Sequence, residues 1–136
     1  MKNKKLFVEA GAFAVLLLAG ILFMLFSRPA APEVLIEQAQ QAVEKGDYEK
    51  ASGLYLAALK KQPENTEALR GLAEAASHLE NNKNLEAALR KLIELEPAEW
   101  QHYYDLINLY LKEGRPEQAD VILQQLKEKK EVEAEN

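Results

Sequence analysis

The chain has 136 residues, no cysteine, and 22 acidic residues against 17 basic ones, which leaves a net charge of −5 at pH 7. This length leaves room for one small domain, and the lack of cysteine excludes a disulfide framework. Residues 29–136 hold 13 Lys and Arg against 21 Asp and Glu. We therefore expect no nucleic acid among the ligands, because this acidic part would repel a polyanion.

The N-terminus is predicted to enter a membrane. Residues 1–5 are basic, and residues 6–26 form an apolar run that only Glu9 interrupts. As a helix this run would span about 32 Å, close to the roughly 30 Å of a bilayer core. We therefore predict a transmembrane helix at 6–26, with the lipid bilayer as a partner. A cleaved signal peptide is the alternative, although its apolar region is ordinarily about 7 to 15 residues long.

The basic residues around this run predict its orientation. Three lysines precede it and one arginine follows it, and cytoplasmic flanks carry the excess of Lys and Arg. In a bacterium this gives a single-pass protein of the cytoplasmic (inner) membrane, with the N-terminus inside and the domain on the extracytoplasmic side. If the membrane belongs to an organelle, the orientation stays open.

The first helical unit follows a linker. Two prolines in residues 27–33 predict a short, stiff connection. Small and apolar residues at helical spacing then predict a helix from Val34 to Lys45. Gly46 can end that helix in the left-handed conformation, and Asp47 can cap the next one. Pro63 ends the second helix and closes the unit.

An internal period of 34 residues extends this pattern to the rest of the chain, since Pro97 repeats the position of Pro63. The second unit begins after Asn65, and its turn has Glu80 where the other units have glycine. Because asparagine tolerates positive φ, we expect the reversal one residue later, at Asn81. A third unit carries Gly114 and the following proline. Such a period is typical of an all-α helix-hairpin solenoid, here of about three repeats over residues 34–129, with a charged tail at 130–136.

A family resemblance supports this architecture. The residues that carry it are Gly46-Asp47-Tyr48-Glu49-Lys50-Ala51, Tyr55, Ala58-Leu59, Pro63 and Asn65. They resemble a tetratricopeptide repeat (TPR), and the resemblance implies that the first helices of successive repeats line a concave groove for a protein or peptide partner. The positions implied in the lining are Glu37, Gln40, Glu44, Arg70, Glu74, Ser77, His78, Tyr104, Asp105, Asn108 and Lys112. The alternative is that these side chains form only the solvated faces of amphipathic helices.

Two further expectations concern binding. Some members of the family clamp a C-terminal carboxylate with cations, but Glu37, Glu44 and Glu74 would repel such a ligand here, and we expect no clamp. The last helix offers a terminal interface at Val121 and Ile122. Its alternative is complete inward packing.

Catalytic motifs are absent from the sequence. His78 and His102 are separate histidines on different predicted helices, and the chain has no cysteine, Gly-rich phosphate loop or His-Glu-x-x-His motif. We therefore expect no enzyme, no catalytic residues, no cofactor and no metal.

Together these features predict a membrane-anchored TPR adaptor or scaffold that mediates protein–protein interaction, through analogy with assembly factors of cell-envelope complexes. Two alternatives remain: a structural subunit of a membrane complex, and an organelle receptor for targeting peptides. The partner and the oligomeric state are left undetermined by the sequence.

Overall fold

A computed structural model describes residues 17–21 and 30–134 of the chain. Residues 17–21 form a short helical segment, in a unit that ends at Ala30. The predicted span at 6–26 otherwise lies outside the described residues. Within the residues described, we find no helix with the length and apolar character needed to cross a bilayer.

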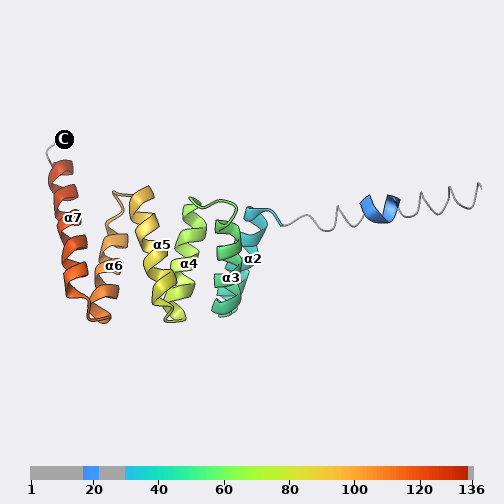
Figure 1. Cartoon of the computed structure of the whole chain (residues 1–136), viewed down its shortest axis with the longest axis horizontal. Coiled ribbons are helices and arrows are strands. Elements are labelled where there is room, and N and C mark those ends of the chain that lie inside the picture. The colour runs from blue at the N-terminus through green and yellow to red at the C-terminus, as the bar shows by residue number, and fades with distance from the viewer. Residues whose placement is uncertain (1–16, 22–29, 135–136) are drawn as a thin grey trace, which may run out of the picture. The chain divides into compact units, whose positions relative to one another are not determined.

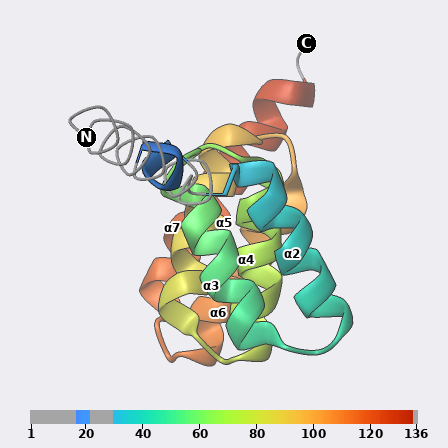
Figure 2. The same cartoon turned by 90° about the vertical axis from the view of Figure 1, so that its right-hand side faces the viewer.

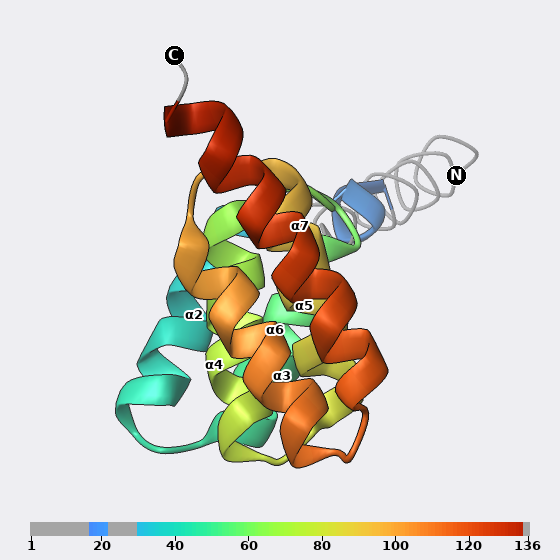
Figure 3. The same cartoon turned by 90° about the vertical axis from the view of Figure 1, so that its left-hand side faces the viewer.

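The rest of the chain, from Ala31 onward, forms a separate compact region that we call the helical unit. It is built from helices in hairpin pairs. The helices are α2 (Pro32–Glu44), α3 (Tyr48–Leu59), α4 (Thr66–His78), α5 (Asn82–Leu95), α6 (Trp100–Lys112) and α7 (Pro116–Ala134). The pairs α2/α3, α4/α5 and α6/α7 stand side by side in chain order (Figure 1), with α2 and α3 at one end and α6 and α7 at the other (Figures 2 and 3). The predicted all-α, TPR-like solenoid is confirmed.

The helix ends follow local side-chain chemistry. The carboxylate of Asp47 accepts a hydrogen bond from the backbone N–H of Lys50 at 3.2 Å, and the side chain of Asn65 accepts one from Ala68 at 2.9 Å. Each satisfies a backbone donor that the first turn of a helix leaves unpaired. These two caps therefore fix the residues at which α3 and α4 begin.

The turns inside the three hairpins share one backbone conformation. Gly46 and Gly114 have φ of 73° and 70°, and Glu80 has φ of 53° at the equivalent position. The expectation that asparagine moves the reversal to Asn81 was therefore wrong. Asn81 instead caps α5, with its side chain accepting from the backbone N–H of Asn84 at 3.2 Å. Because Asn81 is the N-cap of α5, with φ of −83°, the left-handed residue of the turn is the preceding Glu80.

Both ends of the helical unit extend beyond the predicted bounds. Pro32 lies in the first turn of α2, where its missing N–H removes no helix hydrogen bond, so the helix begins before Val34. At the other end α7 continues through Ala134, into the segment expected to be a charged tail.

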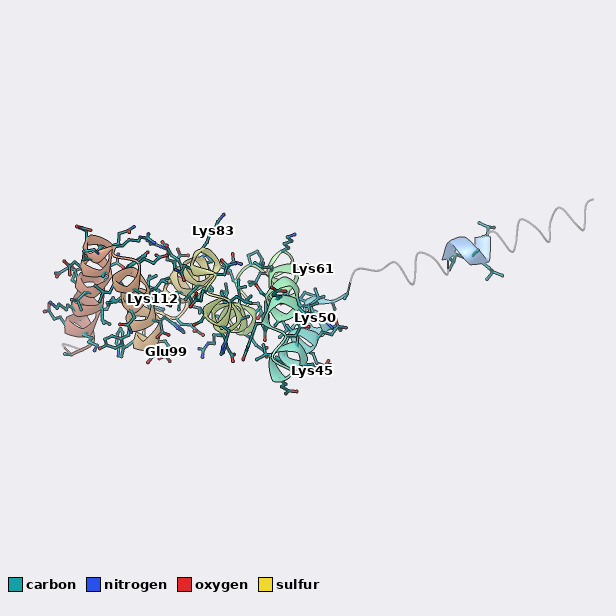
Figure 4. All side chains as sticks on the ribbon, turned by 90° about the horizontal axis from the view of Figure 1, so that it is seen from below. Lys45, Lys50, Lys61, Lys83, Glu99 and Lys112 are labelled. Carbon is teal, nitrogen blue, oxygen red and sulfur yellow. The ribbon has the colours of Figure 1, made fainter. Side chains whose placement is uncertain are left out.

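Figure 4 shows charged side chains over the surface, with Lys61 and Lys83 projecting from one edge and Lys45 from the opposite edge.

The core consists of two clusters. The first contains residues of α2, α3, α4 and α5, and the second contains residues of α6 and α7 together with Leu89 of α5. We call the packing of α2/α3 on α4/α5 the first junction, and that of α4/α5 on α6/α7 the second junction. Tyr55 and Gly71 meet at the first junction so closely that a Cβ atom on residue 71 would lie 2.1 Å from the Tyr55 Cζ atom.

Candidate protein-binding groove

A groove opens between α4 and α6, whose backbones lie farther apart than those of α2 and α4. Residues of α2 contact α4 directly, but no Cα atom of α4 lies within 8 Å of one in α6. The groove has a volume of about 550 Å³, and α5 lies behind it. Its apolar lining consists of Ala73, Leu85, Leu89, Leu92 and Leu109. The second junction is therefore open on one side, where the first junction is closed.

Most of the residues predicted for a groove meet in this one. Its polar rim includes Arg70, Glu74, Ser77 and His78 from α4, and Asp105, Asn108 and Lys112 from α6. Hydrogen-bonding and charged groups thus surround an apolar floor. This is the usual composition of a site that binds part of another protein.

Other predicted residues lie elsewhere. Glu37, Gln40 and Glu44 are exposed on α2 and are not in the lining. Gln40 instead donates from Nε2 to Glu67 Oε1 at 2.7 Å, which ties α2 to α4. Because α2 packs directly against α4, the predicted residues of α2 do not reach the groove between α4 and α6.

Tyr104 also lies outside the groove. Its hydroxyl accepts a hydrogen bond from Lys130 Nζ of α7 at 3.0 Å, and the residue is 43% exposed. Of the two terminal candidates on α7, Val121 is 57% exposed, whereas Ile122 is buried in the second core cluster. Ile122 therefore packs inward and does not present a surface.

A polar bridge crosses one end of the groove. Arg70 of α4 donates to Glu96 Oε2 at 2.8 Å, and the same oxygen lies 3.0 Å from Nε2 of His102 on α6. The hydrogen bond from Arg70, and then that from His102, lower the pKa of the Glu96 carboxyl. His102 is buried, and the sequence reasoning missed its partner because Glu96 lies in the loop after α5, at no helical spacing from it.

The opposite end of the groove carries further polar contacts. Asn82 Nδ2 donates to Glu113 Oε1 at 2.9 Å, and Lys112 Nζ lies 3.9 Å from Glu80 Oε1. Nearby, the imidazole of His78 stacks on the ring of Tyr48, with centroids 3.9 Å apart and an interplanar angle of 9°. These contacts hold the rim side chains of α4 and α6 in place at this end.

A charged cluster fastens the second junction beside the groove. Glu86 of α5 accepts hydrogen bonds from Arg115 at 2.8 Å, from the Tyr110 hydroxyl at 2.8 Å and from Arg90 at 3.1 Å. The Arg115 guanidinium also lies 4.4 Å from the Tyr110 ring centroid. The hydrogen bond from Arg115 is the main reason that the pKa of Glu86 falls to about 2. The cluster keeps α5 and α6 together while α4 and α6 remain apart.

The part of the chain that the structure describes contains no group of three or more His, Cys, Asp or Glu side chains arranged to hold an ion. The groove offers hydrogen bonds, charges and apolar contact, which suit binding.

Comparisons with known proteins agree with the fold. A tetratricopeptide repeat model matches residues 36–84, while no curated protein matches the sequence. Among solved structures, an arginine-to-glutamate mutant of MamA is 20% identical with a TM-score of 0.63, and the match covers 74% of each chain.

Two other structures extend the comparison. An aspartate-to-lysine mutant of MamA is 20% identical with a TM-score of 0.66, over 79% of this chain and 59% of that one. A lysine-to-methionine mutant of the Thermobaculum terrenum O-GlcNAc transferase is 26% identical with a TM-score of 0.55, over 71% of this chain and 19% of that one. The chain spans about three fifths of the second MamA structure and a small part of the transferase. The chain itself contains a tetratricopeptide repeat and has an all-α, TPR-like fold suited to binding other proteins.

Proposed function

We propose that the chain is a membrane-anchored adaptor or scaffold that binds a segment of another protein in the groove between α4 and α6. Its role would be to bring that partner to a complex of the cell envelope during assembly. The observation that carries the proposal is the opening of the second junction into a groove with a leucine floor and a polar rim. We propose binding and not catalysis as its activity.

The chemistry of the groove supports a protein ligand. Leu89 and Leu109 are already buried, so the affinity would come mainly from apolar side chains of the ligand, at about 25 cal/mol per Å² removed from water. The rim groups, such as Asn108 and Glu74, would select the ligand by hydrogen bonding and charge. The Arg70–Glu96–His102 bridge would limit the width of the ligand at one end.

The anchor belongs to the same proposal. The apolar run at 6–26 with its basic N-terminal flank would make the protein single-pass in a bacterial cytoplasmic membrane, with the helical unit on the extracytoplasmic side. A tether holds the groove close to the bilayer. Modest affinity for another membrane-bound protein would then suffice, because tethering raises the effective concentration of the two partners.

Site-specific photocrosslinking tests the groove. A photoreactive residue at Asn108, which lines the groove, should capture a protein partner in native membranes. The matched control is the same residue at Lys50, which is exposed on α3 and away from the groove lining. Capture of one discrete product from Asn108 and not from Lys50 would support the proposal. Equal products from both positions, or none from Asn108, would contradict it.

Two further measurements test the anchor. The full chain should stay in the membrane pellet after alkaline carbonate extraction, and an external protease should cleave the helical unit in spheroplasts. Replacing residues 6–26 with an unrelated spanning helix should leave the Asn108 crosslink unchanged. If the crosslink disappears with the native span, a structural subunit held by that span becomes the better explanation.

A further inference from the structure

The period of 34 residues identifies register positions that face the next repeat. One such position holds Ile36, Arg70 and Tyr104, and another holds Val43, Ser77 and Leu111. In unit one Ile36 is 4% exposed and Val43 packs against the first core cluster, where α2 contacts α4. In unit two the same positions are polar, and they line the groove. Where these two positions are apolar, as in α2, the helix packs directly against the first helix of the next repeat.

Unit three returns to an apolar pattern without a covering helix in the described part of the chain. Tyr104 is 43% exposed and Leu111 is 55% exposed, on the side of α6 that corresponds to the closed side of α2. Figure 3 looks onto this end of the unit, with α7 in front and α6 beside it. We call Tyr104, Leu111 and the neighbouring Lys130 of α7 the terminal face.

Lys130 repeats a connection seen one unit earlier. The pair Tyr104–Lys130 occupies the same two register positions as Arg70–Glu96, and both pairs are hydrogen-bonded. Glu96 also reaches forward to His102, on the first helix of the next unit. Lys130 is a cation at the position of Glu96, so a helix that covers the terminal face would need a carboxylate where α6 has His102.

We propose that the terminal face binds an amphipathic helix of a partner protein, seated as the first helix of a fourth repeat, with apolar side chains on Tyr104 and Leu111 and a carboxylate paired with Lys130. This surface is separate from the groove. Solenoid repeats bury their faces against a neighbour, and the ammonium group of Lys130 beside apolar side chains favours a helix with a carboxylate at the matching position.

A second copy of the chain fits this face less well. The helix it would present is α2, whose outer side carries Gln38 and Gln41, both exposed. The equivalent residues of α6 are Leu106 and Leu109, which are buried. Head-to-tail stacking would therefore bury two amides against an apolar surface, which costs free energy unless each is hydrogen-bonded.

A fused helix tests the chemistry of the face in the full chain. A flexible linker after residue 136 carries a copy of residues 65–79 with Ala68→Glu, since position 68 is equivalent to His102. The matched control copy carries Ala68→Lys. Because fusion raises the effective concentration, weak affinity of a free peptide does not limit the experiment.

Two readouts are local to the face. Trp100 is the single tryptophan of the chain, and its ring lies 5.7 Å from Lys130 Nζ, so its emission should shift when the helix docks. The chain has no native cysteine, so alkylation of a Leu111→Cys variant measures exposure directly. The copy with Ala68→Glu should slow alkylation at least tenfold and the copy with Ala68→Lys less than threefold. Lys130→Glu should reverse this order.

Each remaining outcome decides against the proposal. If both copies protect residue 111 equally, or neither does, the face does not select an acidic helix. Leu111→Cys changes an exposed side chain, so circular dichroism of the variants should match the parent and exclude unfolding as the cause. If the unfused chain self-associates in detergent by sedimentation, and Leu111→Ser abolishes this, a second copy occupies the face and the assignment to a partner helix is overturned.

Discussion

The two junctions of the helical unit use the same repeat geometry but differ in chemistry. The first is closed by apolar and small residues, with Ile36 buried and Tyr55 packed on Gly71. The second has Arg70 at the position of Ile36, and Glu86 at the position of the buried Ser52. A few substitutions at fixed register positions therefore turn a closed contact into a groove fastened from the side by a charged cluster.

This difference separates stability from binding. Apolar contact across the first junction is non-directional and close-packed, which leaves no room for a ligand. Hydrogen bonds and ion pairs across the second junction act at defined points, so α5 and α6 stay together while the space between α4 and α6 remains available. Three changes to the chain test this interpretation, and a fourth concerns a turn inside one hairpin.

Gly71→Ala should have the largest effect, because it acts on the tightest contact of the first junction. The new Cβ would lie 2.1 Å from the buried Tyr55 Cζ, and overpacking of this kind costs about 2 to 3 kcal/mol of unfolding free energy. Urea denaturation measures it. The matched control is Gly53→Ala on α3, where nothing lies within 4 Å and stability should rise by about 0.5 kcal/mol. Equal effects at the two glycines would show that the first junction is not closely packed.

Glu86→Gln should weaken the second junction by about 1 to 2 kcal/mol above pH 5, since hydrogen bonds to a charged group contribute that much. The pKa of Glu86 falls from its ordinary 4.5 to about 2 in the folded chain. The carboxylate therefore stabilises the fold above about pH 4.5, and this contribution is lost as pH falls toward 2. Glu86→Gln should remove that loss from urea titrations between pH 5 and pH 2.

The neutral counterpart at the first junction provides the control. Ser52 is buried at the position equivalent to Glu86, and Ser52→Ala should leave the pH dependence of stability unchanged between pH 5 and pH 2. If Glu86→Gln also leaves it unchanged, the charged cluster does not fasten the second junction.

Arg70→Ile combined with Ser77→Val gives unit two the residues of unit one at the positions that face the next repeat. Both native side chains are exposed, and the change also removes the hydrogen bond from Arg70 to Glu96. We therefore expect the unfolding free energy to change by less than about 1 kcal/mol. Crosslinking from Asn108 should fall about tenfold as the groove fills, equivalent to about 1.4 kcal/mol of binding free energy. Unchanged crosslinking would mean that the partner does not enter between α4 and α6.

The sequence predicted the repeat architecture but only part of the groove. The spacing of Gly46, Pro63 and Pro97 predicts hairpins and their order, because turn and helix-end preferences act locally. The rim residues of units two and three were assigned through the resemblance to the repeat family, and the structure brings most of them together. Glu37 and Glu44 were assigned to the groove by equivalence alone, since the spacing does not reveal which junction is closed.

The polar bridges were missed for a similar reason. Glu96 and His102 lie six residues apart around a loop, and Glu86 meets Arg115 across two helices. Neither spacing has a helical period, so each pair becomes visible only when tertiary packing is known. Tyr104 lies outside the groove because its side of α6 faces away from α4.

Glu80→Gly should have the smallest effect, and it concerns the one hairpin turn that departs from glycine. Glu80 has φ of 53°, against 73° and 70° at Gly46 and Gly114. A left-handed conformation costs a non-glycine residue about 1 to 2 kcal/mol, and glycine removes this cost. The greater entropy of glycine in the unfolded chain offsets part of the gain in stability. We therefore expect a gain of about 0.5 kcal/mol in urea denaturation. Lys45→Gly, one residue before the left-handed Gly46 and with φ of −89°, should instead lower stability. A gain at both positions would show that flexibility, and not the left-handed conformation, controls these turns.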